Sequence, residues 1–329
     1  MKILYAIQGT GNGHISRARD IIPALQKHAT VDILVSGIQS DVQTGFEEKY
    51  RLRGMGFIFG KSGNVDLLET FRKCVTRKFL KEVRELPVSQ YDLVVNDFEP
   101  VSAWAARIKS VPCISLSHQF AVLHNKSPKP AKTDWIGKMV LGNYAPVQEG
   151  FGFHFKSYAE NIFTPVIRQE IRQMQITEED HITVYLPAYD NERLIKVFSE
   201  ITTENWHIFS KHTTRTFQVG NIKIQPIENK AFLESLASCK AVLCGAGFET
   251  PAEAIFMGKK LMVIPMKNQY EQQCNAAALA EMGIRNIKSL KKKYNLLIKD
   301  WLTYSRALHI NYPDETELIV NKILTAYHV

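Results

Sequence analysis

Short apolar runs alternate with segments of helical periodicity along most of the chain. Apolar runs bounded by turn residues predict buried strands, whereas apolar residues repeated every three or four positions predict helices. The predicted strands cover 2–7, 31–35, 57–59, 92–95, 113–116, 161–163, 181–186, 206–210, 222–224, 241–244 and 260–264. The predicted helices cover 14–27, 67–86, 101–108, 192–200, 230–237, 251–257 and 271–282. This alternation indicates an α/β protein whose parallel sheets are built from βαβ units.

The chain of 329 residues is longer than one hydrophobic core usually supports, which predicts two domains. A polar stretch from Thr164 to Asp180 separates two series of strands and helices, and we place the boundary between the two domains there. The expected divisions are an N-terminal Rossmann-like domain at 1–165, a linker at 166–180, a C-terminal Rossmann-like domain at 181–310 and a terminal helix at 311–329. Whether this helix crosses back to the N-terminal domain stays open. The predicted architecture is two doubly wound halves that face each other across a cleft.

The composition is that of an ordinary globular enzyme, with 45% apolar and 22% charged residues. The first residues lack the apolar core of a signal peptide, and no later run approaches the ~18 apolar residues of a membrane-spanning helix. We therefore expect a cytoplasmic protein, or one bound peripherally to the inner face of the membrane. The five cysteines include no pair spaced as metal ligands are, so reduced thiols are expected and a metal site is not.

The net charge of +8 is unevenly spread, and cations clearly outnumber anions in residues 51–84. Apolar residues recur there at helical spacing, with Arg77, Lys78, Lys81 and Arg84 beside them. Such a face can bind an anionic membrane surface, and a simple solvated basic face is the alternative. The stretch lacks interleaved exposed aromatic residues and any recognisable nucleic-acid module, so nucleic acid is not expected as a partner.

A glycine loop, Gly9-Thr-Gly-Asn-Gly-His14, follows the first predicted strand and opens a helix. Glycines let a ligand approach the backbone, and the start of a helix favours negative charge. A dinucleotide fingerprint would need glycine in place of His14 and an acidic residue in place of Ser36-Gly37. His14 is instead a candidate proton acceptor, because the positive end of the helix dipole favours its neutral form. A histidine that merely caps or packs is the alternative. Pro23 predicts a kink in this helix or its early end.

A second glycine turn, Gly245-Ala-Gly247-Phe248, lies between a buried strand and the next helix. The following Thr250-Pro-Ala-Glu253 has the form of a capping box, which gives Glu253 one purely structural role. The next strand leads into a polar segment that ends with Gln272 and Gln273, whose amides both donate and accept hydrogen bonds. Backbone amides, one carboxylate and two side-chain amides at one sheet edge suit a nucleotide joined to a sugar.

These motifs resemble those of GT-B glycosyltransferases, in particular of the MurG-like enzymes that transfer N-acetylglucosamine from UDP. The resemblance implies a donor site at Gly245, Ala246, Gly247, Phe248, Ile227, Phe232, Glu253, Gln272 and Gln273. It implies a loop that faces the cleft and the donor phosphates at Gly11, Asn12, Gly13 and Arg168. Glu253 would bind the ribose and the glutamine pair the sugar, whereas Ile227 and Phe232 are equally well explained as core residues. The chain departs from the family in the spacing before Arg168 and in segment 186–190, which lacks glycine.

A further polar element, Asn96-Asp-Phe-Glu-Pro100, follows another predicted strand at the sheet edge where open α/β sheets bind ligands. Asp97 is expected to orient His14 or to act as the base itself, and capping of the next helix is its structural alternative. Glu99 is expected to bind acceptor hydroxyls, together with His118 after the next strand. His14 and Asp97 are therefore the candidate catalytic residues.

The resemblance implies a metal-independent hexosyltransferase without a cofactor, which takes a nucleotide-diphosphate sugar as donor and inverts the sugar carbon. A UDP-sugar is favoured as donor. The acceptor is a glycan, a lipid or a small molecule, and the sequence does not specify the oligomeric state. Two alternatives stay open, a nucleotide-sugar 2-epimerase of the same fold and a non-catalytic nucleotide-sugar-binding protein.

Overall fold

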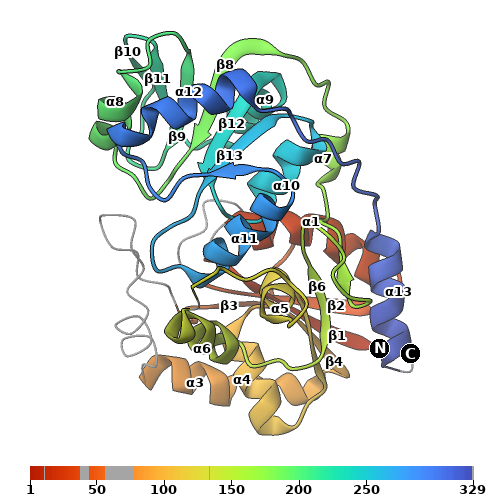
Figure 1. Cartoon of the computed structure of the whole chain (residues 1–329). Helices are drawn as coiled ribbons and strands as arrows, with labels where there is room; N and C mark the ends of the chain where they lie inside the picture. The colour runs from red at the N-terminus through yellow and green to blue at the C-terminus, as the bar shows by residue number, and fades with distance from the viewer. Residues whose placement is uncertain (11, 38–43, 56–76, 133, 328–329) are drawn as a thin grey trace.

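The computed structural model describes residues 1–10, 12–37, 44–55, 77–132 and 134–327 (Figure 1). The predicted strand at 57–59 and the first part of the predicted helix at 67–86 lie outside the described residues. Two sheets, with seven strands each among these residues, occupy the two halves of the chain. This arrangement confirms the α/β architecture that the alternating sequence predicts.

The first sheet has the order β3-β2-β1-β4-β5-β6-β7, and its described strands all pair in parallel. They are β1 (Lys2–Gln8), β2 (Thr30–Ser36), β3 (Tyr50–Leu52), β4 (Leu93–Asp97), β5 (Cys113–Ser117), β6 (Gly150–Phe153) and β7 (Ile162–Phe163). The order reverses between β1 and β4, so the connections after these two strands diverge. A crevice forms at their carboxyl ends, where ligands bind in such sheets.

Helices cover both faces of the first sheet (Figure 1). They are α1 (Asn12–Gln26), α3 (Arg77–Glu85), α4 (Pro100–Lys109), α5 (His118–Leu123) and α6 (Trp135–Tyr144). Alternate side chains of β1 enter different cores, since Tyr5 packs in the cluster that contains α1 and Leu4 in the cluster that contains α4. α1 continues through Pro23, so the early end predicted at this proline is not observed.

The second sheet has the order β10-β11-β9-β8-β12-β13-β14, with β10 antiparallel at one edge. Its strands are β8 (Glu179–Tyr185), β9 (Trp206–Ser210), β10 (Phe217–Val219), β11 (Ile222–Pro226), β12 (Cys239–Gly245), β13 (Lys260–Ile264) and β14 (Arg285–Asn286). Its helices are α7 (Gln169–Arg172), α8 (Asn191–Phe198), α9 (Asn229–Ser238), α10 (Glu249–Phe256), α11 (Tyr270–Glu281) and α12 (Asn295–Tyr304). The order again reverses, here between β8 and β12, which places a second crevice at the loop that joins β12 to α10.

The last helix, α13 (Thr316–Ala326), packs against α1 of the first half (Figure 1). Its buried residues Ile319, Val320 and Ile323 share a core cluster with Ile21 of α1. α11 of the second half contacts α5 and α6 of the first. The two crevices are therefore held close together by contacts on more than one side.

Candidate active site

The histidine of the first glycine loop and the aspartate that ends β4 form a hydrogen-bonded pair. β1 leads into α1, which places His14 in the first turn of that helix, and β4 lies beside β1 in the sheet. Nδ1 of His14 lies 2.8 Å from Oδ1 of Asp97. Because a carboxylate only accepts hydrogen bonds, Nδ1 carries a proton, and in the neutral ring Nε2 keeps its lone pair. The pair thus presents one basic nitrogen on the side away from Asp97.

The pKa of His14 is set by two opposing causes. Burial lowers this pKa, but the charge and hydrogen bond of Asp97 outweigh burial, so the pKa is raised from 6.5. Asp97 thus acts against the helix dipole, which alone would favour the neutral ring. Because the folded pKa lies above the unfolded one, protonated His14 stabilises the fold below about pH 6.5, and this contribution disappears as the pH rises through the folded pKa.

Arg17 completes a charged cluster that the sequence analysis missed. It lies one helical turn after His14, so both side chains are on the same face of α1. Its guanidinium donates to both carboxylate oxygens of Asp97, at 2.8 Å each, and also to Glu249 at the start of α10. The side chain of Arg17 is only 2% exposed. The i, i+3 spacing from His14 is the signal that would have identified this residue.

The second glycine turn joins β12 to α10, but the helix begins earlier than predicted. Phe248 is its N-cap residue, so the capping box predicted at Thr250 is wrong. Pro251 is tolerated in the first turn because the amides there have no partner inside the helix. These amides and the positive end of the helix dipole lie beside Gly247, where an added Cβ would meet nothing within 4 Å. The turn therefore offers donors and space for an anionic group.

Glu253 and Arg168 form a buried ion pair in the second half. Nε of Arg168 lies 2.8 Å from Oε1 of Glu253, and Nη1 contacts Glu170 and Asn229. Burial raises the pKa of Glu253, and the charge of Arg168 opposes this shift. The structure thus brings the predicted ribose residue and the predicted phosphate residue together. Arg168 is engaged with carboxylates, and its position holds Glu253 in one orientation.

The glutamine pair lies in the first turn of α11, close to the second glycine turn. Oε1 of Gln272 accepts from the amide of Met266 at 2.9 Å and would lie 3.7 Å from a Cβ at Gly245. Both Gln272 and Gln273 are half-buried. They lie at the start of the helix that the sequence predicts at 271–282.

The two residues predicted to contact the nucleobase of the donor, Ile227 and Phe232, differ in how deeply they are buried. Phe232 is 9% exposed and packs edge-on against Phe209 in the core. Ile227 is half-buried and packs against the same core cluster. For Phe232 the structure therefore favours the core role that the sequence left open.

The carboxylate of Glu99 is bonded within the chain. It is fully buried and caps α4 by accepting from the amides of Val101 and Ser102. It also accepts from the hydroxyl of Ser36 at 2.6 Å. The predicted contact with acceptor hydroxyls is thus replaced by helix capping, the role considered beforehand for Asp97.

His118 is also occupied within the chain, at the contact between the two halves. Its ring stacks on Phe248 with 3.9 Å between ring centroids. Its Nδ1 lies 2.8 Å from the carbonyl of Phe153, and its Nε2 lies 2.8 Å from Oδ1 of Asn275 in α11. His118 is 2% exposed, so the structure gives it a packing role beside the second glycine turn instead of the predicted acceptor contact.

The remaining predicted cleft residues belong to the first glycine loop. Gly11 and the side chain of Asn12 lie outside the described residues. Gly13 lies directly against Glu249, with which an added Cβ would clash.

Among the described residues, His, Cys, Asp and Glu side chains do not gather in groups of three that could hold a metal ion. Every described helix is too short or too polar to cross a bilayer.

Solved structures of the same architecture support the GT-B fold. UGT89C1 from Arabidopsis thaliana, complexed with UDP, has 13% identity and a TM-score of 0.60, over 100% of this chain and 99% of that chain. SsfS6 from Streptomyces sp. SF2575, complexed with thymidine diphosphate, has 12% identity and a TM-score of 0.59, over 99% of each chain. MurG from Acinetobacter baumannii has 13% identity and a TM-score of 0.53, also over 99% of each chain. At these identities the likeness shows the fold alone, and it confirms the predicted architecture.

The sequence family gives the activity class. No curated protein matches the chain. The family model described as Glycosyl transferase family 1, however, matches residues 1–303. The match includes both glycine turns, the His14–Asp97 pair and the whole second sheet. The chain therefore belongs to Glycosyl transferase family 1 and is a glycosyltransferase of the GT-B fold.

Proposed function

We propose that the protein moves a hexosyl group from a nucleotide-diphosphate sugar to an acceptor hydroxyl, with inversion at the sugar carbon and a UDP-sugar as the favoured donor. The observation that carries this proposal is the pairing of His14 with Asp97, which Arg17 joins to Glu249. Glu249 lies beside the second glycine turn (245–248), which we call the donor turn. Structures of the same fold that hold UDP and thymidine diphosphate support the class of donor.

In this mechanism Nε2 of His14 accepts the proton of the acceptor hydroxyl while the hydroxyl oxygen forms a bond to the anomeric carbon. The bond between that carbon and the diphosphate oxygen breaks, and its electron pair leaves with the nucleotide diphosphate. Asp97 keeps the ring oriented and stabilises the imidazolium that forms. Attack from the side opposite the leaving group inverts the carbon.

The departing diphosphate is stabilised by the chain itself and needs no resident metal. The first-turn amides of α10 and its dipole supply this stabilisation beside Gly247. Gln272 and Gln273, at the start of α11, provide amide groups for the hydroxyls of the sugar. Glu253, which Arg168 orients, accepts from the ribose hydroxyls.

Thermal unfolding with nucleotide diphosphates tests the donor, and product analysis tests the reaction. UDP at about 100 times its Kd is expected to raise the free energy of unfolding by about 2.7 kcal/mol. A transferase releases UDP from the donor when an acceptor is added, whereas a 2-epimerase interconverts donor sugars without an acceptor. Stabilisation without any product would identify a binding protein. No stabilisation by UDP, GDP, ADP, CDP or dTDP would contradict the proposal.

We further propose an anionic membrane surface as a partner, with the protein cytoplasmic and peripheral on the inner face. α3 exposes Arg77, Lys78, Lys81 and Arg84, while its apolar side packs into the core. α6 exposes the large apolar side chain of Trp135, which is 72% accessible. Cations and an exposed indole are together suited to a lipid headgroup surface.

Liposome flotation tests this partner. The protein is expected to float with vesicles that contain phosphatidylserine and to stay behind with neutral vesicles. Because each cation near such a surface contributes about 1 kcal/mol, Lys78→Ser with Lys81→Ser should weaken binding roughly 30-fold. Equal flotation with neutral and anionic vesicles would contradict the proposed binding to an anionic membrane surface.

A further inference from the structure

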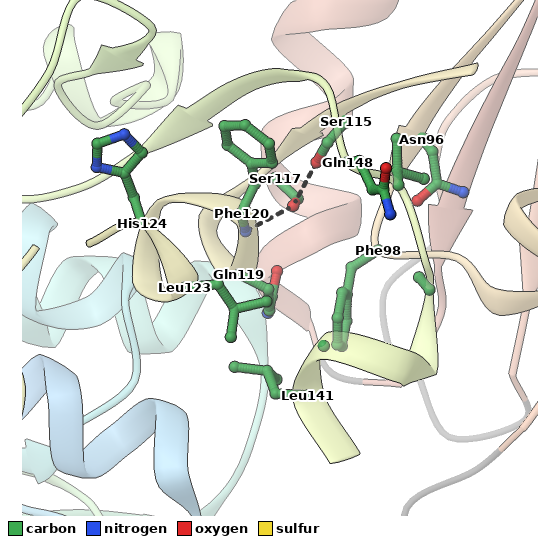
Figure 2. Close-up of a pocket in the computed structure, with 13 residues that line it drawn as sticks. Asn96, Phe98, Ser115, Ser117, Gln119, Phe120, Leu123, His124, Leu141 and Gln148 are labelled. Atoms are coloured by element: carbon green, nitrogen blue, oxygen red, sulfur yellow. Dashed lines mark hydrogen bonds between the residues drawn. The ribbon is translucent and has the colours of Figure 1, made fainter. Parts of the chain in front are cut away.

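A cavity of about 250 Å³ lies at the carboxyl ends of β4 and β5, and Phe98 and Gln119 are among the residues that line it (Figure 2). Two of the residues that line it also contact His14. The ring of Phe98 stacks on the imidazole with 6.4 Å between ring centroids, and Nε2 of Gln119 lies 3.4 Å from Nε2 of His14. Phe98 and Gln119 therefore connect the cavity to the proposed base.

The described lining of the cavity contains no aspartate, glutamate, lysine or arginine. Phe98, Leu123 and Leu141 form its apolar part, and Ser115 and Ser117 bring hydroxyls from β5 that bond to each other at 2.9 Å (Figure 2). An ion that entered would meet no carboxylate, lysine or arginine there, and His124 is the lining residue that can carry a charge. The lining thus suits an uncharged molecule with an apolar body.

Gln119 is the lining residue that points to a specific contact. It is 4% exposed, and its Nε2 donates to Glu271 of α11 at 2.9 Å. Because a carboxylate cannot donate, this bond fixes the amide with Oε1 turned away from Glu271. Oε1 is buried and has no hydrogen-bond partner among the described residues. It is therefore suited to accept a hydrogen bond from a molecule in the cavity.

Phe98 provides a flat wall next to the base. Its backbone has a φ of 58°, a left-handed conformation that is uncommon for residues other than glycine. Its ring stacks on Tyr144 with 4.9 Å between ring centroids and also stacks on His14. Uncommon backbone conformations of this kind are retained where the surroundings impose them, often at functional sites. Phe98 also lines the cavity, so a ring held there can contact its side chain.

We propose that the cavity is the acceptor site and that it takes a compact, uncharged ring compound with two hydroxyl groups. One hydroxyl faces Nε2 of His14 and is the nucleophile, and the other donates to Oε1 of Gln119. The inference rests on the proposed transferase function, and it narrows the acceptor from a glycan, lipid or small molecule to a neutral small molecule.

Three probes with one ring and different charges test this class of acceptor. They are 4-hydroxybenzyl alcohol, its carboxylate counterpart 4-hydroxybenzoate and its cationic counterpart 4-hydroxybenzylamine. Calorimetry with the full chain and UDP is expected to show the uncharged alcohol binding at least about tenfold more tightly than either ion. Equal or tighter binding of an ion, or no detectable binding of the alcohol, would overturn the inference.

A variant that fills the cavity locates the binding. Gly142 of α6 lines the cavity, and a Cβ added there would meet nothing within 4 Å, so Gly142→Leu adds bulk at the lining. It should weaken binding of the alcohol at least about tenfold and leave UDP affinity within about twofold. The exposed neighbour Asn143, which is not part of the lining, gives the matched control Asn143→Leu, with both affinities unchanged. Alcohol binding that survives in Gly142→Leu would contradict the inference while leaving the transferase proposal intact.

A second comparison isolates the contact with Gln119. Gln119→Leu should lower affinity for 4-hydroxybenzyl alcohol by about tenfold and leave affinity for 4-methylphenol, which lacks the second hydroxyl, almost unchanged. Equal losses for both probes would show a purely structural role and would overturn the assignment. Probe binding as expected, but without sugar transfer to any hydroxyl, would instead contradict the proposed function.

Discussion

His14→Ala is expected to lower kcat by about 10²–10⁴-fold, the usual contribution of a positioned general base. The imidazole would no longer take the proton of the acceptor hydroxyl, so the nucleophile would have to lose it to water. UDP affinity should change by less than about twofold, because the proposed donor contacts lie on α10 and α11 of the other half. Steady-state transfer assays and calorimetry with UDP measure the two effects separately.

A second histidine, just after the end of the same helix, provides the control for this variant. His28 is 39% exposed and lies near Glu317 at the surface, so His28→Ala should leave kcat within about twofold. His14→Gln keeps a side chain that can donate to Asp97 but has no proton acceptor of comparable basicity, and it should be as impaired as His14→Ala. Unchanged turnover in His14→Ala would remove His14 from catalysis.

The same assignment fixes the sign of the pH dependence. Burial lowers the pKa of His14, but Asp97 outweighs burial and raises it above 6.5. A base must be neutral to act, so kcat/KM should rise with pH through that raised pKa. Asp97→Asn removes the opposing charge, so the rise should move to lower pH while the maximal rate falls. A rise that stays in place would assign the titration to another group.

The parts of the site that sequence could predict are those encoded by local order. Gly13 and His14 follow a strand and open a helix, and Asp97 ends a strand, so the doubly wound topology alone places them at one sheet edge. The second glycine turn at 245–248 is equally local. Their order along the chain was sufficient because parallel strands bring successive loops to the same side.

The parts that sequence could not predict depend on pairing between distant segments. Glu253 resembled a cap residue because its partner Arg168 is far away in the chain, and an ion pair leaves no periodic signal. Glu99 resembled a ligand residue because an exposed carboxylate and an N-cap carboxylate occur in the same kind of sequence. The sequence alone does not show which side chains are buried. Burial decides whether such a carboxylate has a structural role or contacts a ligand.

Arg17→Met should destabilise the fold by about 3–5 kcal/mol, the usual cost of breaking a buried ion pair from one side. Asp97 is fully buried, and among the side chains that the structure describes it would keep only His14 as a hydrogen-bond partner. Burial raises the pKa of Asp97, but Arg17 is the largest of the groups that lower it below its usual range. Without Arg17 the carboxylate of Asp97 would take up a proton more readily. A protonated Asp97 would hold the His14 ring less firmly in the orientation that the base needs. Denaturant unfolding and kcat should therefore decline together.

Two further variants test whether burial of the positive charge and the geometry of the Arg17 guanidinium matter. Lys27→Met removes a cation whose side chain is 63% exposed, and it should cost less than about 1 kcal/mol. Arg17→Lys keeps the charge but cannot contact Asp97 bidentately and Glu249 at once, so it should fall between wild type and Arg17→Met. If Arg17→Met is no less stable than Lys27→Met, the buried cluster is not the anchor of the site.

Glu249→Gln distinguishes support of the base from contact between the halves. The side chain of Glu249 is 25% exposed, so its loss should cost much less stability than loss of Arg17. Arg17 would still hold Asp97 and His14, and the pH at which kcat/KM rises should move little. If the contact with Glu249 helps to hold the donor turn near the base, KM for the donor should increase while kcat is largely retained. An equal loss of kcat in both variants would mean that Arg17 and Glu249 act on the chemistry as one unit.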